Sequence, residues 1–383
     1  MKIVIAPAAF KGSLSPLQAA RAIDLGVRST LPQADTLLVP VADGGDGTLE
    51  VIHHVRGGVI HEKTISGPLG RPVRASWALL SDGETGIIEM ASASGLALLM
   101  PGEQDPMRAS THGVGELIRD ALGKGIRKLI IGLGGSATVD GGAGMAQALG
   151  VGLLNRKGRP LPRGGGSLSQ LDRIDPGGLD PRIRQCKIVA AYDVSNPLLG
   201  PNGAPQVYGP QKGATPDMVR KLEDALGRLA ETIKHDIGID VAGLPGAGAA
   251  GGLGAGLAAF LGARLVSGTD LVLEEISLRR KLTGAHLVIT AEGRLDYQSA
   301  YGKAPIGVAR TARDLHVPVL ALTGGLGEGY RALYLEGVDA VMPIVPGPIS
   351  LEEAQREAYG LLADAAERAI KIVALGGRWT PGR

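Results

Sequence analysis

The sequence predicts an α/β protein with two domains, one of which is a doubly wound parallel sheet formed by both ends of the chain. Short apolar runs alternate with amphipathic segments near the N-terminus, and the same alternation returns near the C-terminus. The region between them has a different pattern, typical of antiparallel strands and long loops. A length of 383 residues is sufficient for two such domains.

The N-terminal part is predicted to run strand, helix, strand, helix. The two strands are KIVIAPA and TLLVPVAD, and the second helix is GTLEVIHHV. Ser15, Pro16 and Gln18 predict where the first helix begins. The serine can cap the helix, proline suits its first position, and the glutamine can bond back to the cap.

The C-terminal part repeats this order. Its predicted strands are HLVIT, VPVLALTGG and VDAVMPI, a helix is entered at Pro305, and a short helix covers YRALYLEG. A long terminal helix is predicted to begin at Ser350, with Glu353 completing its capping box. Its apolar residues recur at helical spacing, at Leu361, Leu362, Ala365, Ala366, Ala369 and Val373.

The central region contains PVRASWALL and GIIEM on either side of SDGETG, which predicts an antiparallel hairpin. We therefore expect an inserted mixed α/β domain over residues 62–281. Residues 1–61 and 282–383 are then expected to form the parallel-sheet domain. Two sequential domains are the alternative.

The composition limits the possible partners. The formal net charge is +2, lysine and arginine are scattered, and aromatic residues make up 3% of the chain, so neither a nucleic-acid surface nor a stacking platform is predicted. The single cysteine, Cys186, excludes an intrachain disulfide or a cysteine metal cluster. The N-terminus lacks a signal-peptide core, and the longest apolar stretch, 246–263, is too short for a membrane span. We expect a cytoplasmic protein with a small, charged substrate.

Glycine is unusually frequent, at 60 residues, and it gathers at the ends of apolar runs. Residues 132–150, GLGGSATVDGGAGMAQALG, form a predicted strand-to-helix turn. Glycines there leave backbone N–H groups open to a ligand, and the helix N-terminus favours an anion such as phosphate. The alternative is a tight packing turn.

Acidic residues and lysines also follow apolar runs. They are Asp43, Asp46, Asp140, Asp193, Glu292 and Asp296, with Lys11, Lys212 and Lys303. Ligands of open α/β sheets bind at the carboxyl ends of strands. Glycine-rich turns, lysines and carboxylates for Mg²⁺ and for the acceptor hydroxyl are the parts that phosphoryl transfer requires. Alternatively, each aspartate caps a helix or closes a turn, and Asp46 and Asp140 are the strongest candidates for that role.

The sequence contains neither a Walker A motif nor the protein-kinase motifs, and its histidines lack metal-binding spacing. Residues 246–251 and 132–137 fit the dinucleotide pattern GxGxxG/A, but chance matches are expected in a chain so rich in glycine. The run after the second match is followed by Arg156 rather than an acidic residue. A basic residue at this point suits NADP rather than NAD, so the alternative function is an NADP-dependent oxidoreductase.

Seven motifs in order resemble the bacterial glycerate kinase family of the type that is neither P-loop nor sugar-kinase-like. They are FKGSLS, PVADGGDGT, GGSATVDGG, DVSNPLLG, GPQKGA, PGAGAAGGLGA and EGRLDYQS. The resemblance implies a kinase of organic-acid metabolism that phosphorylates D-glycerate with ATP and Mg²⁺, with 2-phosphoglycerate as the expected product. It also implies a flavodoxin-like domain, a second α/β domain, and a monomer or homodimer.

Site residues follow from these motifs and from side-chain chemistry. The predicted catalytic residues are Asp193, Asp43 and Lys11. The predicted glycerate-binding residues are Ser13, Asn196, Arg294, Asp296 and Gln298. The predicted ATP-binding residues are Gly134, Gly135, Ser136, Thr138, Lys212, Gly248 and Lys303. The predicted Mg²⁺ ligands are Asp46 and Glu292. We expect these side chains to surround one cavity large enough for a triphosphate.

The chain also departs from the family pattern. The family usually has Asp-Ser where this chain has Ala8 and Ala9, Gly where it has Ala291, and Asn where it has Val139. The change at Ala8 removes a carboxylate from the end of the first strand. The alternative function is therefore a weak or non-catalytic binder of glycerate or nucleotide.

Overall fold

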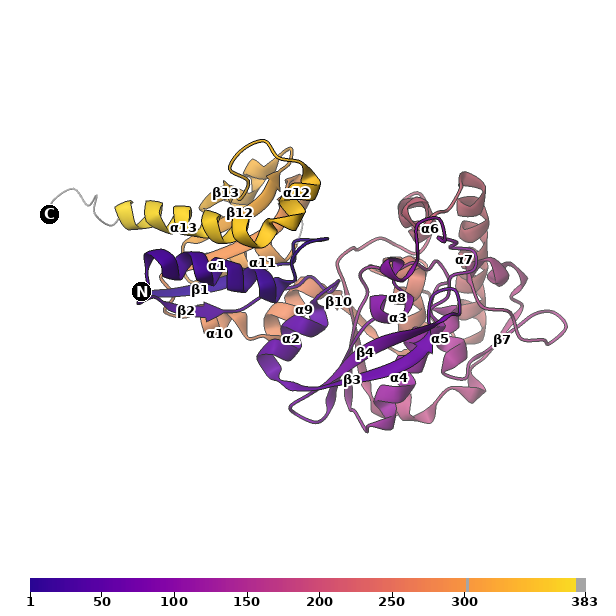
Figure 1. The fold of residues 1–383 in the computed structure, drawn as a ribbon. Coiled ribbons are helices and arrows are strands. Elements are labelled where there is room, and N and C mark those ends of the chain that lie inside the picture. The colour runs from indigo at the N-terminus through magenta and orange to yellow at the C-terminus, as the bar shows by residue number, and fades with distance from the viewer. Residues whose placement is uncertain (301–302, 377–383) are drawn as a thin grey trace. The chain divides into compact units, whose positions relative to one another are not determined.

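The structure is a computed structural model that describes residues 1–300 and 303–376 (Figure 1). Contacts divide the chain into two units. Unit 1 comprises Met1–Asp43, Glu50–Val55 and the chain from Thr269 onward, and unit 2 comprises Gly44–Leu49 and Arg56–Gly268. These limits lie before the expected boundaries at 61 and 281. Strand β3 starts at Gly58 and pairs with β4 in unit 2, and the helices after residue 268 belong to unit 1.

Unit 1 contains a five-stranded sheet in which every pair of neighbouring strands is parallel. Its strands are β1 (Lys2–Pro7), β2 (Asp35–Leu38), β11 (Leu287–Leu295), β12 (Val319–Leu326) and β13 (Ala340–Pro343). Across the sheet the order is β2, β1, β11, β12, β13, which is the flavodoxin-like order 2-1-3-4-5. The structure confirms that both chain ends build one doubly wound parallel sheet.

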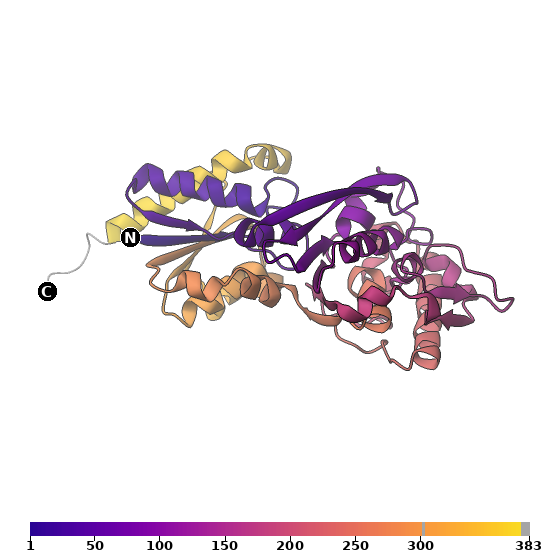
Figure 2. The ribbon, with the colours of Figure 1, turned by 90° about the horizontal axis from the view of Figure 1, so that it is seen from below.

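Helices cover both faces of this sheet. Figure 2 shows α1 and α13 on one side and the orange helices α9 to α11 on the other. The helices that lie wholly or mainly in unit 1 are α1 (Pro16–Thr30), α2 (Thr48–Arg56), α9 (Gly268–Glu275), α10 (Leu278–Leu282), α11 (Ala304–Arg313), α12 (Leu351–Arg356) and α13 (Ala358–Gly376). At Gly26 of α1, an added Cβ would lie 2.1 Å from the carbonyl oxygen of Ala363 on α13. The two helices therefore touch backbone to backbone at this glycine.

The predicted start of α1 is confirmed, because Ser15 and Gln18 form both hydrogen bonds of a capping box. The predicted terminal helix differs from the structure, since it is divided into α12 and α13 at Glu357, whose φ of −94° and ψ of 7° depart from helical values. The predicted helix over YRALYLEG is a 3₁₀ helix, Tyr330–Glu336. Val373, which the spacing placed on the apolar face, is 38% exposed, since the buried part of α13 ends at Ile370.

Unit 2 contains a six-stranded mixed sheet, with the order β10, β9, β6, β5, β4, β3. The hairpin of β4 and β5 is antiparallel as predicted, and β3 pairs antiparallel with β4, whereas β5, β6, β9 and β10 are parallel neighbours. The strands are β3 (Gly58–Ser66), β4 (Pro72–Leu80), β5 (Thr85–Glu89), β6 (Lys128–Gly132), β9 (Lys187–Tyr192) and β10 (Arg264–Ser267), with a separate pair of β7 (Gly152–Leu154) and β8 (Arg173–Asp175).

The unit 2 helices are α3 (Ala91–Ser94), α4 (His112–Gly123), α5 (Ala143–Ala148), α6 (Ala204–Tyr208), α7 (Pro216–Asp236) and α8 (Ala249–Leu261). They share one apolar core with the sheet, and its buried members run from Ile65 to Ala263. No helix in the described part of the chain combines the length and the apolar character that crossing a membrane requires.

Candidate active site

A cavity of about 510 Å³ lies in unit 1 at the carboxyl ends of the parallel strands. It opens where β1 and β11 are neighbours, which is the point at which the strand order reverses and where open α/β sheets bind ligands. Five predicted site residues line it, namely Lys11, Ser13, Glu292, Arg294 and Lys303. The cavity is therefore rich in cationic groups around one buried carboxylate.

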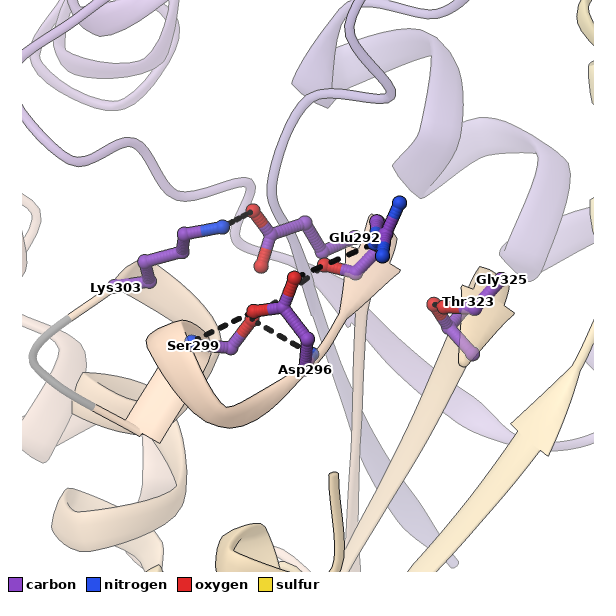
Figure 3. A network of polar contacts seen from close by, with 7 residues as sticks. Glu292, Asp296, Ser299, Lys303, Thr323 and Gly325 are labelled. Carbon is purple, nitrogen blue, oxygen red and sulfur yellow. Dashed lines mark hydrogen bonds and ion pairs between the residues drawn. The ribbon is translucent and has the colours of Figure 1, made fainter. Parts of the chain in front are cut away.

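Glu292 is that carboxylate, and it is largely buried. Its Oε1 accepts a hydrogen bond from Nζ of Lys303 at 3.2 Å (Figure 3), whereas Oε2 is buried without a partner among the described atoms. Burial raises the pKa of Glu292, and the nearby carboxylate of Asp43 raises it further, while Lys303 and Lys11 oppose these effects. An acidic group with one unsatisfied oxygen is suited to a cation or to a substrate hydroxyl.

Asp296 organises the loop after β11. Its carboxylate accepts a hydrogen bond from the backbone N–H of Ser299 at 3.3 Å (Figure 3). It also forms an ion pair of 3.3 Å with Arg294. Asp296 therefore supports the 3₁₀ turn Tyr297–Ala300, while Arg294 lines the cavity. The side chain of Gln298, another predicted glycerate ligand, lies outside the described part of the structure.

Ala8 continues β1 by one residue, because its N–H donates to the carbonyl oxygen of Ala291 at 2.8 Å. The methyl group of Ala8 is buried. A carboxylate at this position would stand next to the β11 segment that carries Glu292. The departure from the family pattern therefore affects the same strand ends that line the unit 1 cavity.

A second cavity, of about 260 Å³, lies in unit 2. Five predicted site residues line it, namely Gly134, Gly135, Ser136, Asp193 and Lys212. The glycine loop follows β6 and Asp193 follows β9 directly, so both come from the carboxyl ends of neighbouring parallel strands. Two further polar residues of this lining, Tyr208 and Gln211, were not predicted as ligands. Gln211 stands beside Lys212 in the GPQKGA motif, whereas Tyr208 lies in the short helix α6, outside the motifs.

Lys212 is fully buried and ties the glycine loop together. Its Nζ donates to Oγ of Ser136 at 2.7 Å and to the carbonyl oxygen of Thr138 at 2.8 Å. Burial lowers the pKa of Lys212 to about 7, against the opposing effect of Asp140. Lys212 therefore both lines the cavity and fixes the conformation of its loop.

Asp46 lies beside this loop in unit 2. A Cβ added at Gly135, where φ is +73°, would be 2.8 Å from Oδ1 of Asp46, and one added at Gly134 would be 2.4 Å from Cα of Gly45. Any side chain at these positions would displace the segment 44–49. The glycines therefore permit the carboxylate of Asp46 to approach the loop.

Three other predicted ligands are not part of the lining of the unit 2 cavity. Asn196 accepts a hydrogen bond from the Tyr208 hydroxyl at 2.7 Å and donates to the carbonyl oxygen of Asn202 at 2.8 Å, so it orients Tyr208. Gly248 packs on the backbone, since its Cβ would lie 2.2 Å from the carbonyl oxygen of Pro197. Thr138 is fully buried.

Asp140 has a structural role, the one that the sequence offered as the alternative to ligand binding. Its buried carboxylate accepts N–H groups of Thr111, Gly142 and Gly144, and burial raises its pKa. It therefore closes the turn before α5.

The two dinucleotide-like motifs lack the strand–turn–helix geometry that binds a pyrophosphate. Residues 237–248, all of them described, contain no strand, and Ala250 to Gly252 adopt left-handed φ values between 54° and 90°. After the glycines at 132–137, helix α5 begins only at Ala143.

The model of the glycerate kinase family matches residues 3–374. The chain belongs to the glycerate kinase family. It is 50% identical to a glycerate kinase of Halalkalibacterium halodurans over 97% of each chain, and 47% identical to a glycerate 2-kinase of Escherichia coli over 99% of each. A crystal structure assigned to glycerate kinase 2 of Salmonella typhimurium LT2 superposes with a TM-score of 0.87 at 45% identity, over 99% of both chains. This family membership confirms the resemblance seen in the seven motifs.

Proposed function

We propose that this member of the glycerate kinase family transfers the γ-phosphoryl group of ATP to the 2-hydroxyl of D-glycerate. The observation that carries the proposal is the 47% identity to the Escherichia coli glycerate 2-kinase over 99% of each chain. The chemistry of the two cavities supports it, because each combines at least one cationic group with a carboxylate.

The unit 2 loop is proposed to bind the ATP phosphates. Gly134, Gly135 and Ser136 line the cavity, their backbone N–H groups are the proposed donors, and Lys212 supplies a cationic group. Asp46 beside this loop fits a Mg²⁺ ligand, because Mg²⁺ is held by one or two carboxylates together with substrate phosphates. When bound, Mg²⁺ neutralises charge on the transferring group.

The unit 1 cavity is proposed to take the carboxylate of glycerate and a cation. Lys11 and Arg294 provide donors for a carboxylate, with Ser13 on the same lining. Lys303 holds Glu292 through Oε1, and the unpartnered Oε2 fits a cation or a hydroxyl proton. Asp43 adds a second carboxylate near Glu292.

Asp193 is proposed as the general base. It accepts the proton of the 2-hydroxyl while the glycerate oxygen forms a bond to the γ-phosphorus, and the bond from that phosphorus to the ADP oxygen breaks. General bases contribute about 10²- to 10⁴-fold to turnover. We therefore expect Asp193→Asn to lower kcat by about that factor, with Asp224→Asn, an exposed aspartate of the same unit, as the control. Unchanged kcat and KM in Asp193→Asn would remove this role.

The deciding experiment is an ADP-release assay with D-glycerate, ATP and Mg²⁺, followed by NMR of the product. Phosphorus coupling to C2 identifies 2-phosphoglycerate, and coupling to C3 identifies the other isomer. Omitting glycerate or Mg²⁺ should reduce ADP release to background. Background release with all components present would refute the kinase proposal.

Alanine at position 8, where the family usually has aspartate, favours a second candidate, a binder of glycerate or nucleotide with weak or no turnover. Calorimetric binding of either ligand together with background ADP release would support it. In that case the double variant Ala8→Asp, Ala9→Ser should gain turnover, because it restores the family carboxylate. Equal turnover of the two proteins would show that the carboxylate is not what limits this chain.

A further inference from the structure

A further cavity, of about 200 Å³, lies in unit 2 and shares no residue with the proposed active-site cavities. Its walls are the β3–β4 turn, residues 67–70, together with Arg108, Ser110, His112 and Arg163. Two arginines and a histidine thus surround a space large enough for a small anion.

Close backbone contacts fix these walls. A Cβ at Gly113 would lie 2.0 Å from the carbonyl oxygen of Ser66, and one at Gly164 would lie 2.7 Å from that of Met107. The N–H of Ser110 donates to the carbonyl oxygen of Pro68 at 2.9 Å. The three segments are therefore locked together, and the cavity is preformed.

The two arginines are available to a ligand. Nη1 of Arg163 donates to Oγ of Ser66 at 3.3 Å, a neutral partner. Among the described residues, no carboxylate lies within the 4.0 Å ion-pair distance of Arg108 or Arg163. The guanidinium fork matches the geometry of phosphate oxygens and binds them with charge-assisted hydrogen bonds.

His112 adds an unsatisfied polar atom. Its side chain is 15% exposed, and the buried Nδ1 lacks a hydrogen-bond partner in the described structure, lying 3.7 Å from Oε1 of Glu116. Burial and the charge of Arg163 lower the pKa of His112 to about 4, so the ring is neutral at pH 7. His112 also begins α4, whose preceding residue Thr111 bonds to Asp140 instead of capping the helix. The N–H of His112 donates to Oγ of Ser110 at 3.3 Å, and the helix dipole at this end of α4 favours negative charge.

We propose that this cavity is an additional binding site for a small phosphate-bearing anion, held by the guanidinium groups of Arg108 and Arg163 and by a ring nitrogen of His112. The shared chemistry is a tetrahedral oxyanion. Its source is either free inorganic phosphate or the phosphate monoester of a small metabolite.

The test uses the ring carbon signal of His112 in ¹³C-histidine-labelled full-length protein, assigned by its loss in His112→Gln. This signal reports on the cavity itself, whatever binds elsewhere. Titration with inorganic phosphate and with glycerol 3-phosphate should shift it to saturation. Tighter binding of the monoester assigns the site to a metabolite, and tighter binding of inorganic phosphate assigns it to the free ion.

The variant Arg108→Gln, Arg163→Gln should weaken this binding at least tenfold, equivalent to about 1.4 kcal/mol. Arg184→Gln removes an exposed arginine of the same unit and should bind as the wild type does. Thermal unfolding verifies that each variant is folded, and Arg163→Gln alone, at an exposed position, serves if the double variant is not. A His112 signal that never moves, or equal affinity in the double variant and the wild type, overturns the proposal.

Discussion

Glu292 and Lys212 show how burial adjusts individual groups toward the proposed chemistry. Burial removes water from Glu292 and raises its pKa, whereas the hydrogen-bonded cation of Lys303 lowers it. Lys212 loses solvent and is fixed by Ser136 and Thr138. Both groups are held in one position before any ligand arrives, which is what catalysis by charge placement requires.

The ion pair of Glu292 leads to a prediction about pH. Lys303 lowers the pKa of Glu292, so Lys303→Met should raise it further and move the acidic limb of the kcat/KM profile to higher pH. Lys303→Arg keeps the charge and should retain the wild-type limb. Superimposable acidic limbs in the wild type and Lys303→Met would show that Glu292 does not control activity.

Lys212 leads to a prediction about stability. Its folded pKa of about 7 lies below the ordinary value of 10.5, so between these values the unfolded chain binds a proton that the folded chain does not. This contribution to the free energy of unfolding therefore increases as pH rises through that window. Urea unfolding at about pH 7 and about pH 9.5 should show a smaller increase for Lys212→Met than for the wild type. The exposed Lys157→Met is the control, and equal increases in all three proteins would contradict the argument.

At the residue scale, the sequence predicted which positions gather at strand ends, because carboxyl ends of parallel strands share one edge. Lys11, Glu292 and Lys303 line one cavity for this reason, and Asp193 lines the other. The sequence did not reveal which polar groups bond to the protein itself. A motif shows that an amide such as Asn196 is present. The structure shows that this amide is already hydrogen-bonded to Tyr208 and Asn202. The expected single triphosphate-sized cavity remains a prediction.

At the element scale, glycine decides how closely helices and loops approach. Alanine normally stabilises a helix interior by about 1 kcal/mol relative to glycine. At Gly26 an added Cβ would meet the carbonyl oxygen of Ala363 at 2.1 Å, so helix α1 would have to move away from α13. At Gly227, inside α7, nothing lies within 4 Å of the added Cβ. The same substitution should therefore have opposite effects in the two helices.

We expect Gly26→Ala to lower the free energy of unfolding by about 1–3 kcal/mol through overpacking. Gly227→Ala should raise it by about 1 kcal/mol through helix propensity. Urea unfolding of both variants beside the wild type measures these changes. Stabilisation by Gly26→Ala would mean that the backbone contact between the helices relaxes at little cost.

Capping chemistry was predictable at this scale because its partners are close in sequence, as for Ser15 and Gln18. The division at Glu357 was not predictable, since the apolar spacing continues through it. The same holds for the 3₁₀ turn at Tyr330–Glu336, whose residues suit an α-helix equally well.

At the scale of the whole molecule, the two units differ in how their cores are assembled. All six strands of the mixed sheet and every buried residue of the unit 2 core lie between residues 58 and 267. The parallel sheet of unit 1 instead needs strands from both ends of the chain. The mixed sheet was predictable only in part, because its hairpin is local while β3 carries little apolar alternation. The separate pair of β7 and β8 carries equally little.

This difference predicts that a fragment of residues 56–268 folds by itself. It retains the whole unit 2 core, including fully buried Trp77, but lacks the 44–49 segment beside the glycine loop. It should unfold cooperatively in urea, with a near-ultraviolet dichroism signal from Trp77. A fragment of residues 1–55 lacks three of the five unit 1 strands and should remain unfolded as a control. A non-cooperative transition in the 56–268 fragment would show that unit 2 depends on the rest of the chain.

Strand β1 meets β11 only across a long stretch of chain, since Ile3 is paired with Leu287, which lies 284 positions later. A ribosome adding 5–20 residues per second needs on the order of 15 to 60 s to synthesise that stretch. During this interval the emerging KIVIAP segment has an unpaired edge and no completed sheet to shield it. The nascent polypeptide thus exposes an unpaired edge of β1 until β11 has been synthesised, and we expect chaperones to bind this strand during that interval.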